Sequence, residues 1–225
     1  MILIGDIGNT DTKICLINSR FKIIKRLFFS SKNMNKKILF KKINNFLSNN
    51  SKIKSSLFCS VVPNNFNQIK SILNNRFNIK IKELKNLNLN KIIKIKANKK
   101  QIGSDRIANA LSIFSKNKNF IILDFGTATT FDVVIGNVYH GGVIAPGLKL
   151  SLNTLIDHAS QIPVIDLKKI NKVIGKNTIS AVRSGFFWGY NGLIDNIIKL
   201  IQKECKKSFK IIITGGFSPL FKKSI

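Results

Sequence analysis

Two short stretches contain residue types that could hold a nucleotide phosphate. In one, an apolar run over Phe120–Leu123 leads to the carboxylate of Asp124, a glycine at 126 and several hydroxyls, and the chain returns as Phe131–Val134. This pattern predicts a strand, a tight turn and a second strand. Gly126 permits a turn whose amide N–H groups point outward and can hold an anion. Asp124, at the rim of that turn, could hold a cation.

The first residues of the chain repeat this arrangement. Met1–Ile7 is apolar apart from Asp6, and Gly8 and further hydroxyls follow. One hairpin with a glycine turn is a common and weak signal, but two in matching places indicate an internally duplicated fold. The aligned pairs are Asp6 with Asp124, Ile7 with Phe125, Gly8 with Gly126 and Thr12 with Thr130.

A third carboxylate, Asp105, stands at the predicted start of a helix. Gly103-Ser-Asp-Arg106 precedes an apolar face at helical spacing, formed by Ile107, Ala108, Ala110, Leu111 and Phe114. Asp105 can simply cap that helix, whose dipole stabilises the charged carboxylate. It can equally be held in place to accept a proton or orient a hydroxyl, with Arg106 beside it for an anion. Both interpretations are open at the level of the sequence.

The elements around these motifs predict a mixed α/β fold. After the first hairpin we expect a third strand, a helix, a strand and a second helix, followed by a Lys/Asn-rich stretch of surface strand and loop. The ranges, in that order, are Phe21–Phe29, Lys36–Leu47, Ser56–Pro63, Asn67–Phe77 and Lys80–Lys100.

The last third of the chain predicts a glycine-rich turn, two helices and a buried strand that is followed by a helix start. These are Gly141–Gly147, Ser151–His158, the long helix opened by Asn177, Lys210–Gly216 and the cap at Ser218-Pro219. Small residues interrupt the long helix, where each glycine costs about 1 kcal/mol relative to alanine. They predict close approach of a neighbouring helix, a second subunit or a ligand, and they are Ser184, Gly185, Gly189 and Gly192. The double glycine at 215–216 could let a nucleotide lie against the backbone.

Composition places the chain among globular proteins without membrane spans. Its 225 residues are 44% hydrophobic and 21% charged. No apolar run approaches the roughly 20 residues that cross a bilayer. Met1–Ile7 contains a carboxylate and no cleavage site, so we interpret it as a strand rather than a signal peptide, and we expect a cytoplasmic protein. Cys15, Cys59 and Cys205 are too far apart for a zinc site and are expected to be reduced and buried.

The formal net charge of +28 does not by itself indicate nucleic-acid binding. The lysines are spread over nearly the whole chain and accompany abundant Asn, Ile and Phe, which together suggest A/T-rich codons. A nucleic-acid-binding protein would gather its charge on one element among aromatic or recognition residues. The sequence contains no such cluster, so we do not expect specific nucleic-acid binding.

Seven motifs, in this order, resemble the type III pantothenate kinase family along nearly the whole chain. The two hairpins and the late Thr-Gly-Gly correspond to the phosphate-1, phosphate-2 and adenosine motifs of the actin, hexokinase and acetate kinase superfamily. The motifs are Asp6–Lys13, Ser60–Pro63, Gly103–Arg106, Asp124–Thr130, Gly141–Gly147, Asn177-Thr178 with Ser184-Gly185, and Thr214–Gly216. The absence of Gly-x-x-x-x-Gly-Lys-Ser/Thr excludes the other common cradle for ATP.

The resemblance implies a fold and a reaction. The fold would be α/β, with two duplicated actin-like (ribonuclease H-like) domains whose mixed sheets are flanked by helices, with ATP in the cleft between them. The domains would span residues 1–115 and 116–225. The reaction would transfer a phosphoryl group from ATP to the primary hydroxyl of pantothenate, the first step of coenzyme A synthesis. Members of the family act as homodimers.

The resemblance also implies a role for individual residues. Asp105 would be the general base, Asp124 would bind the K⁺ or NH₄⁺ that the family requires, and Asp6 would hold the Mg²⁺ of the nucleotide. Pantothenate would contact Gly103, Ser104, Asp105, Arg106 and Thr178. ATP would contact Thr127 and the first phosphate loop, which consists of Asp6, Ile7, Gly8, Asn9, Thr10, Asp11, Thr12 and Lys13.

Two departures from the family pattern keep alternatives open. Lys96-Ala-Asn-Lys99 replaces a Tyr-Asp-Asn-Pro-like segment, and the chain stops at Ile225, where family members usually continue. One alternative is a catalytically weak or inactive member that acts as a transcription accessory protein. A kinase with another small hydroxyl substrate is the other.

Overall fold

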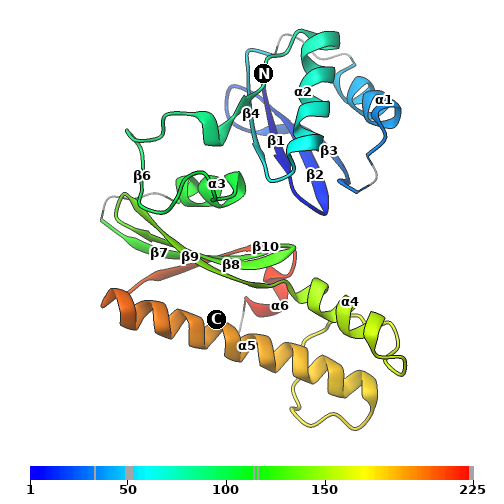
Figure 1. The fold of residues 1–225 in the computed structure, drawn as a ribbon, viewed down its shortest axis with the longest axis vertical. Helices are drawn as coiled ribbons and strands as arrows, with labels where there is room; N and C mark the ends of the chain where they lie inside the picture. Colours follow the sequence, from blue (N-terminus) through cyan, green and yellow to red (C-terminus); the bar gives the residue numbers. More distant parts are fainter. Residues whose placement is uncertain (33, 49–52, 114, 116, 223–225) are drawn as a thin grey trace. The chain divides into compact units, whose positions relative to one another are not determined.

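The computed structural model describes residues 1–32, 34–48, 53–113, 115 and 117–222, and these form two compact units (Figure 1). The first unit comprises Met1–Ile93 and Ala97–Ser112, and the second comprises Lys94–Lys96 and Ile113–Ile225. Phe114, in the predicted helix face, and the last three residues lie outside the described part of the chain. Within that part, no helix is long and apolar enough to span a membrane.

The first unit contains a five-stranded mixed sheet in the order β3-β2-β1-β4-β5. Strands β1, β2 and β3 form an antiparallel meander, whereas β4 pairs parallel to β1 and β5 parallel to β4. The bounds are β1 Ile2–Ile7, β2 Asp11–Ile17, β3 Ile23–Ser30, β4 Ser55–Ser60 and β5 Lys82–Glu83.

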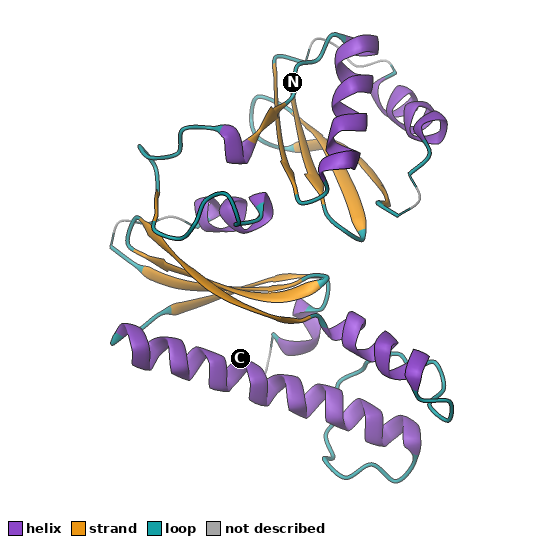
Figure 2. Cartoon of the chain, viewed as in Figure 1, coloured by secondary structure: helices purple, strands orange, loops and turns teal. Residues whose placement is uncertain are grey.

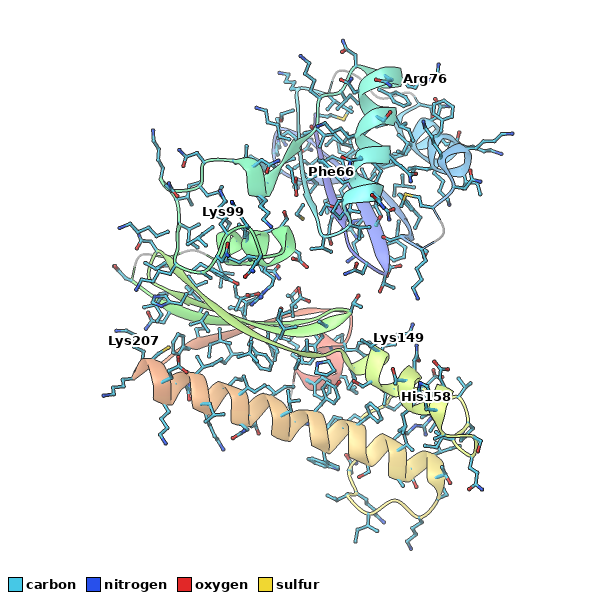
Figure 3. The ribbon with its side chains drawn as sticks, viewed as in Figure 1. Phe66, Arg76, Lys99, Lys149, His158 and Lys207 are labelled. Carbon is cyan, nitrogen blue, oxygen red and sulfur yellow. The ribbon has the colours of Figure 1, made fainter. Side chains whose placement is uncertain are left out.

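Helices α1 (Lys36–Leu47) and α2 (Pro63–Phe77) cover one face of this sheet (Figure 2). Helix α1 has the bounds that the sequence predicts, because the Asn35 side chain accepts a hydrogen bond from the Lys37 amide and fixes the helix start. Helix α2 begins at Pro63, four residues before the predicted start, because proline is well suited to the first turn. Phe66, labelled in Figure 3, is one of the buried side chains of α2 in the core.

Two short helices lie in the last part of the first unit, and the second of them, α3, packs against β4. The 3₁₀ helix η1 spans Leu84–Asn86, and α3 spans Ser104–Ser112. Between them in the sequence, β6 (Lys94–Ile95) belongs to the second unit and pairs parallel to β9 there. Lys99, labelled in Figure 3, donates a hydrogen bond from Nζ to the Leu87 carbonyl at 3.1 Å.

The second unit repeats the sheet pattern of the first. Its order is β10-β7-β8-β9-β6, with β7, β8 and β9 as an antiparallel meander and β10 parallel to β7. The run β10-β7-β8-β9 therefore corresponds to β4-β1-β2-β3, which confirms the duplicated α/β architecture. The bounds are β7 Asn119–Phe125, β8 Ala128–Ile135, β9 Val138–Pro146 and β10 Lys210–Gly215.

Three helices complete the second unit, and the longest, α5 (Thr178–Cys205), packs along one face of its sheet (Figure 2). Asn177 caps α5 through a reciprocal pair of hydrogen bonds with Ser180, as the predicted opening at Asn177 requires. The other helices are α4 (Leu148–His158) and α6 (Ser218–Phe221). Stacked rings of Phe125 and Phe221, 4.9 Å apart between centroids, join α6 to the end of β7.

Several local predictions were wrong. The glycine-rich stretch from residue 141 is not a turn but continues β9, with Gly141 at φ 111° where the register with β8 shifts. Glycine allows that bulge because a side chain would strain a positive φ. Strand β10 is half-buried rather than buried, the cysteines are half-buried free thiols, and Phe217 rather than Ser218 is the N-cap of α6.

Basic side chains extend from separate elements in both units. Arg76 on α2 of the first unit, and Lys149 on α4 and Lys207 after α5 of the second, are all exposed and are labelled in Figure 3. The positive charge is thus a general property of the surface rather than of one element.

Candidate functional site

The first predicted phosphate loop is the turn between β1 and β2. The Gly8 amide donates to the Asp11 carbonyl at 3.0 Å, which closes the turn. Asp6 lies opposite Lys13 in the ladder, and the Asp6 Oδ2 and Lys13 Nζ atoms are 3.9 Å apart. Both side chains are about half exposed, at 47% and 58%, so a charged ligand can reach them.

A buried polar network supports this loop from behind. Thr12 is fully buried, and its hydroxyl lies 2.8 Å from the hydroxyl of Ser31. The Asn65 side chain on α2 donates to the Ser31 carbonyl at 2.9 Å, and the Ser31 amide donates to the Thr10 carbonyl at 2.8 Å. The loop is therefore tied to both β3 and α2 by hydrogen bonds that are shielded from water.

Asp105 lies in the first turn of α3 and accepts a hydrogen bond at Oδ1 from the Arg106 amide at 2.8 Å. Asp105 is thus the second residue of α3 rather than its N-cap, since a capping side chain accepts from the amide two or three residues further on. The contact with Arg106 fixes the orientation of the carboxylate. Gly103 leaves room for it, since a methyl group there would overlap Asp105 Oδ1 and lie 3.1 Å from Val61 Cγ1. The fully buried Ser104 donates to Glu83 Oε1 at 3.2 Å and so attaches the start of α3 to β5.

Cys59 of β4 lies beside the carboxylate of Asp6, a position that sequence reasoning missed. Its Sγ is 3.8 Å from Asp6 Oδ1 and 3.6 Å from the Gly5 carbonyl. Burial, then the charges of Asp6 and Asp105, raise the pKa of the Cys59 thiol to about 12. The structure therefore places this thiol beside Asp6, although Cys59 and Asp6 are far apart in the sequence.

The second predicted phosphate loop joins β7 to β8 and is one residue shorter than the first. Gly126 donates to the Ala128 carbonyl at 3.1 Å, as Gly8 does to Asp11. Thr12 lies opposite Ile7, whereas Thr129, not Thr130, lies opposite Phe125. The aligned pair Thr12 and Thr130 is therefore corrected to Thr12 and Thr129, because a constant offset cannot allow for a shorter turn.

Glycine backbone packs directly against this second loop. A methyl group on Gly147 would overlap the Thr127 carbonyl and lie 3.0 Å from the Gly126 oxygen. Gly215 has φ 90°, and a methyl group there would lie 2.6 Å from Asp124 Oδ1. The Gly216 amide donates to the Phe125 carbonyl at 3.1 Å, and Gly216 has open space where a side chain would be. Of the predicted double glycine, only Gly216 offers such space to a ligand.

The remaining predicted residue, Thr178, is the first residue of α5 and is exposed. The loop before it is held against the helix start, since a side chain on Gly175 would overlap the backbone of Ala181. The predicted residues thus fall in two sets: those from Asp6 to Lys13 and Gly103 to Arg106 in the first unit, and Asp124, Thr127 and Thr178 in the second.

Comparison with known sequences identifies relatives of this chain. The sequence model of the family "Type III pantothenate kinase" matches residues 2–200. A type III pantothenate kinase of Pelagibacter ubique (strain HTCC1062) is 66% identical over 225 residues, which is 100% of this chain and 91% of the relative. Other curated relatives of the same name align over about half of their own length, for example 49%, 46% and 47%.

Solved structures share the fold at low sequence identity. A Campylobacter jejuni protein assigned to the Baf family of transcriptional activators superposes with a TM-score of 0.59 at 20% identity, covering 99% of this chain and 87% of that one. A ROK family protein from Streptococcus pneumoniae TIGR4 gives a TM-score of 0.54 at 13% identity, covering 99% and 83%. At such identities the likeness shows the actin-like, sugar-kinase-like fold alone.

Proposed function

The chain belongs to the type III pantothenate kinase family, and from this premise we propose that it phosphorylates pantothenate with ATP to give 4′-phosphopantothenate. The observation that carries the proposal is 66% identity to a pantothenate kinase along the whole chain. The reaction requires positive charge and N–H groups around phosphate oxygens. The half-exposed Lys13 would supply positive charge at the first turn, and further backbone N–H groups of the two turns would supply donors.

The loop from Asp6 to Lys13 would hold the ATP phosphates, and Asp6 would hold the accompanying Mg²⁺. Magnesium is commonly bound by one or two carboxylates together with phosphates and water, so a half-exposed Asp6 fits that ion. The described residues contain no group of three or more His, Cys, Asp or Glu that could hold a metal, which agrees with an ion that arrives with the nucleotide. When bound, Mg²⁺ would neutralise developing charge on the phosphate oxygens.

Asp124 would hold K⁺ or NH₄⁺ beside the second loop, where Thr127 would contact ATP. Asp124 Oδ1 and the Ala128 carbonyl oxygen both lie within 4 Å of the position that a side chain on Gly126 would occupy, so two oxygen donors lie beside this turn. A monovalent cation prefers such oxygen donors and would add positive charge near the phosphates.

Asp105 would accept the proton of the pantothenate hydroxyl, with Gly103, Arg106 and Thr178 contacting the substrate. Ser104, which was also predicted to contact pantothenate, is fully buried and would instead hold the start of α3 in place. The Arg106 amide fixes the Asp105 carboxylate at 2.8 Å, so little reorganisation is needed before proton transfer.

The test is an assay with Mg-ATP, K⁺ and pantothenate, in which phosphopantothenate is detected by mass spectrometry. Asp105→Asn should lower kcat by about 100-fold or more, because general-base catalysis contributes that much, while the melting temperature stays close to that of the wild type. Asp157→Asn, which changes an exposed carboxylate on α4, is the matched control and should retain activity. A folded, inactive wild type would contradict the proposal.

We further propose a homodimer formed through α5. Gly185, Gly189 and Gly192 lie on one exposed helical face with nothing within 4 Å of the position of a side chain, and Trp188 on the same face is 39% exposed. Light scattering should give twice the chain mass. Gly189→Leu should shift the protein toward the monomer, whereas Asp157→Leu, at an exposed position on α4, should not. A monomeric wild type at micromolar concentration would refute this proposal.

A cytoplasmic location stays a prediction from the sequence.

A further inference from the structure

Tyr190 on α5 carries a nearly buried hydroxyl that links three elements of the second unit. The side chain is 9% exposed, and its hydroxyl donates to the Pro146 carbonyl at 3.0 Å. The hydroxyl of Ser151, on α4, lies 3.1 Å from the hydroxyl oxygen of Tyr190. A phenol has one proton, so when Tyr190 donates to Pro146, Ser151 donates to Tyr190. Strand β9, helix α4 and helix α5 are joined at this one atom.

Tyr190 binds the carbonyl of Pro146, and the next residue, Gly147, packs against the second phosphate loop. Pro146 ends β9 opposite Ala128. Gly147 follows it and lies against the Gly126 and Thr127 carbonyls so tightly that a methyl group would overlap Thr127. The Ser151 amide donates to the Gly147 carbonyl at 2.9 Å. Gly147 is therefore held from the Pro146 side by Tyr190 and from the α4 side by Ser151.

The ring of Tyr190 is itself immobilised. It stacks on Phe186 with centroids 6.2 Å apart and lies 6.4 Å from the ring of Phe221, both on the apolar core. A hydroxyl placed in such surroundings costs free energy unless it is hydrogen-bonded. The ring contacts are those that a phenylalanine would also make, so what the hydroxyl adds is its hydrogen bonds with Pro146 and Ser151.

We propose that Tyr190 is a positioning residue for ATP, because it fixes Pro146 and Gly147 and thereby holds the Gly126–Thr127 turn in the geometry that receives the phosphates. The inference rests on the proposed function of that turn. Tyr190 does not itself contact the nucleotide. Its loss should therefore weaken ATP binding selectively and leave pantothenate binding unchanged.

The chain offers a matched control because it contains two tyrosines. Tyr139 on β9 is 1% exposed and donates to the buried Asp132 at 2.6 Å, further along the hairpin from the loop. Tyr190→Phe and Tyr139→Phe each delete one buried hydroxyl and keep the ring. A purely structural effect would lower the melting temperature in both variants, whereas an effect on the loop would appear in Tyr190→Phe alone.

The experiment measures the Kd for Mg-ATP by calorimetry and the KM values for ATP and pantothenate. Tyr190→Phe should raise the Kd and KM for ATP about three- to tenfold, the scale of one lost hydrogen bond, with the KM for pantothenate within twofold of the wild type. Ser151→Ala should raise the Kd for ATP less, because the contact with Pro146 remains. Tyr139→Phe should leave the Kd for Mg-ATP and the KM for ATP within twofold of the wild type.

Equal changes in the two tyrosine variants, or equal changes in the two KM values of Tyr190→Phe, would overturn the inference. A wild type that binds Mg-ATP but does not phosphorylate pantothenate would refute the proposed reaction, while the Kd ratios would still decide the role of Tyr190. A wild type that does not bind Mg-ATP would overturn both.

Discussion

The turn after β1 and the turn after β7 have the same residue types at their start but are held by different chemistry. Behind the first turn, the hydroxyls of Thr12 and Ser31 and the amide of Asn65 form buried hydrogen bonds. Behind the second, the backbone of Gly147 and Gly215 packs directly on the loop, and Thr129, which occupies the place of Thr12, has a buried hydroxyl with no hydrogen-bond partner among the described residues.

The difference shows that a duplicated motif specifies the turn but not its support. A single added carbon prevents the close packing of a glycine backbone against the loop. In a hydrogen-bonded network, by contrast, one substitution removes one hydrogen bond and leaves the others. The same substitution at equivalent positions of the two loops should therefore change stability by different amounts.

The largest effect is expected when one carbon is added behind each loop. Gly147→Ala should destabilise the protein by about 3 kcal/mol, because the neighbour is backbone that cannot move aside. Gly8→Ala should cost about 1 kcal/mol or less, since its nearest neighbour, the Asp11 carbonyl, is 3.1 Å away and can shift slightly. Urea unfolding of both variants measures the difference, and equal losses would show that the loops are supported alike.

A smaller effect is expected from removing the two equivalent hydroxyls. Thr12→Val should lower the free energy of unfolding by about 1–2 kcal/mol, because it leaves the buried Ser31 hydroxyl without its partner. Thr129→Val removes a buried hydroxyl that makes no hydrogen bond, so it should change stability by less than about 0.5 kcal/mol or increase it. The same unfolding assay applies, and a Thr129→Val variant as unstable as Thr12→Val would contradict the assignment of the two supports.

The smallest effect concerns the thiol beside the first loop. The pKa of Cys59 rises from an ordinary 9.0 to about 12 on folding, so between those values the unfolded chain loses a proton that the folded chain keeps. Stability contributed by Cys59 is therefore intact below pH 9 and declines as the pH rises through this window. Relative to that of Cys59→Ala, the free energy of unfolding of the wild type should fall by about 1 kcal/mol between pH 8 and pH 10. A pH-independent difference between wild type and variant would exclude the raised pKa, and Cys59→Ser should behave like Cys59→Ala.

Local signals in the sequence predicted much of the fold. Apolar residues at helical spacing placed α1 correctly, and Asn177, which caps α5 by short-range hydrogen bonds, placed the start of α5. The paired hairpins revealed the duplication, because strand-turn-strand patterns are also local. The bulge at Gly141 was missed because a run of glycines is equally typical of a turn.

The contacts that support the candidate site could not be predicted, because they join distant parts of the chain. Cys59 meets Asp6 only through the parallel pairing of β4 with β1, and no spacing rule relates the two residues. Gly147 and Tyr190 reach the second loop through the return of β9 and the packing of α5. Their types, a glycine and an aromatic residue, are common in any core. The roles assigned to Asp105, Asp124 and Thr178 stay predictions.

The most direct measurement is turnover by the purified wild-type chain with Mg-ATP and pantothenate, with and without K⁺. A pantothenate kinase that uses Asp105 as its base and a cation at Asp124 should form ADP and phosphopantothenate in equal amounts, and removing K⁺ should strongly reduce the rate. A folded protein that yields no phosphopantothenate, or that phosphorylates only other small alcohols, would contradict the proposed function.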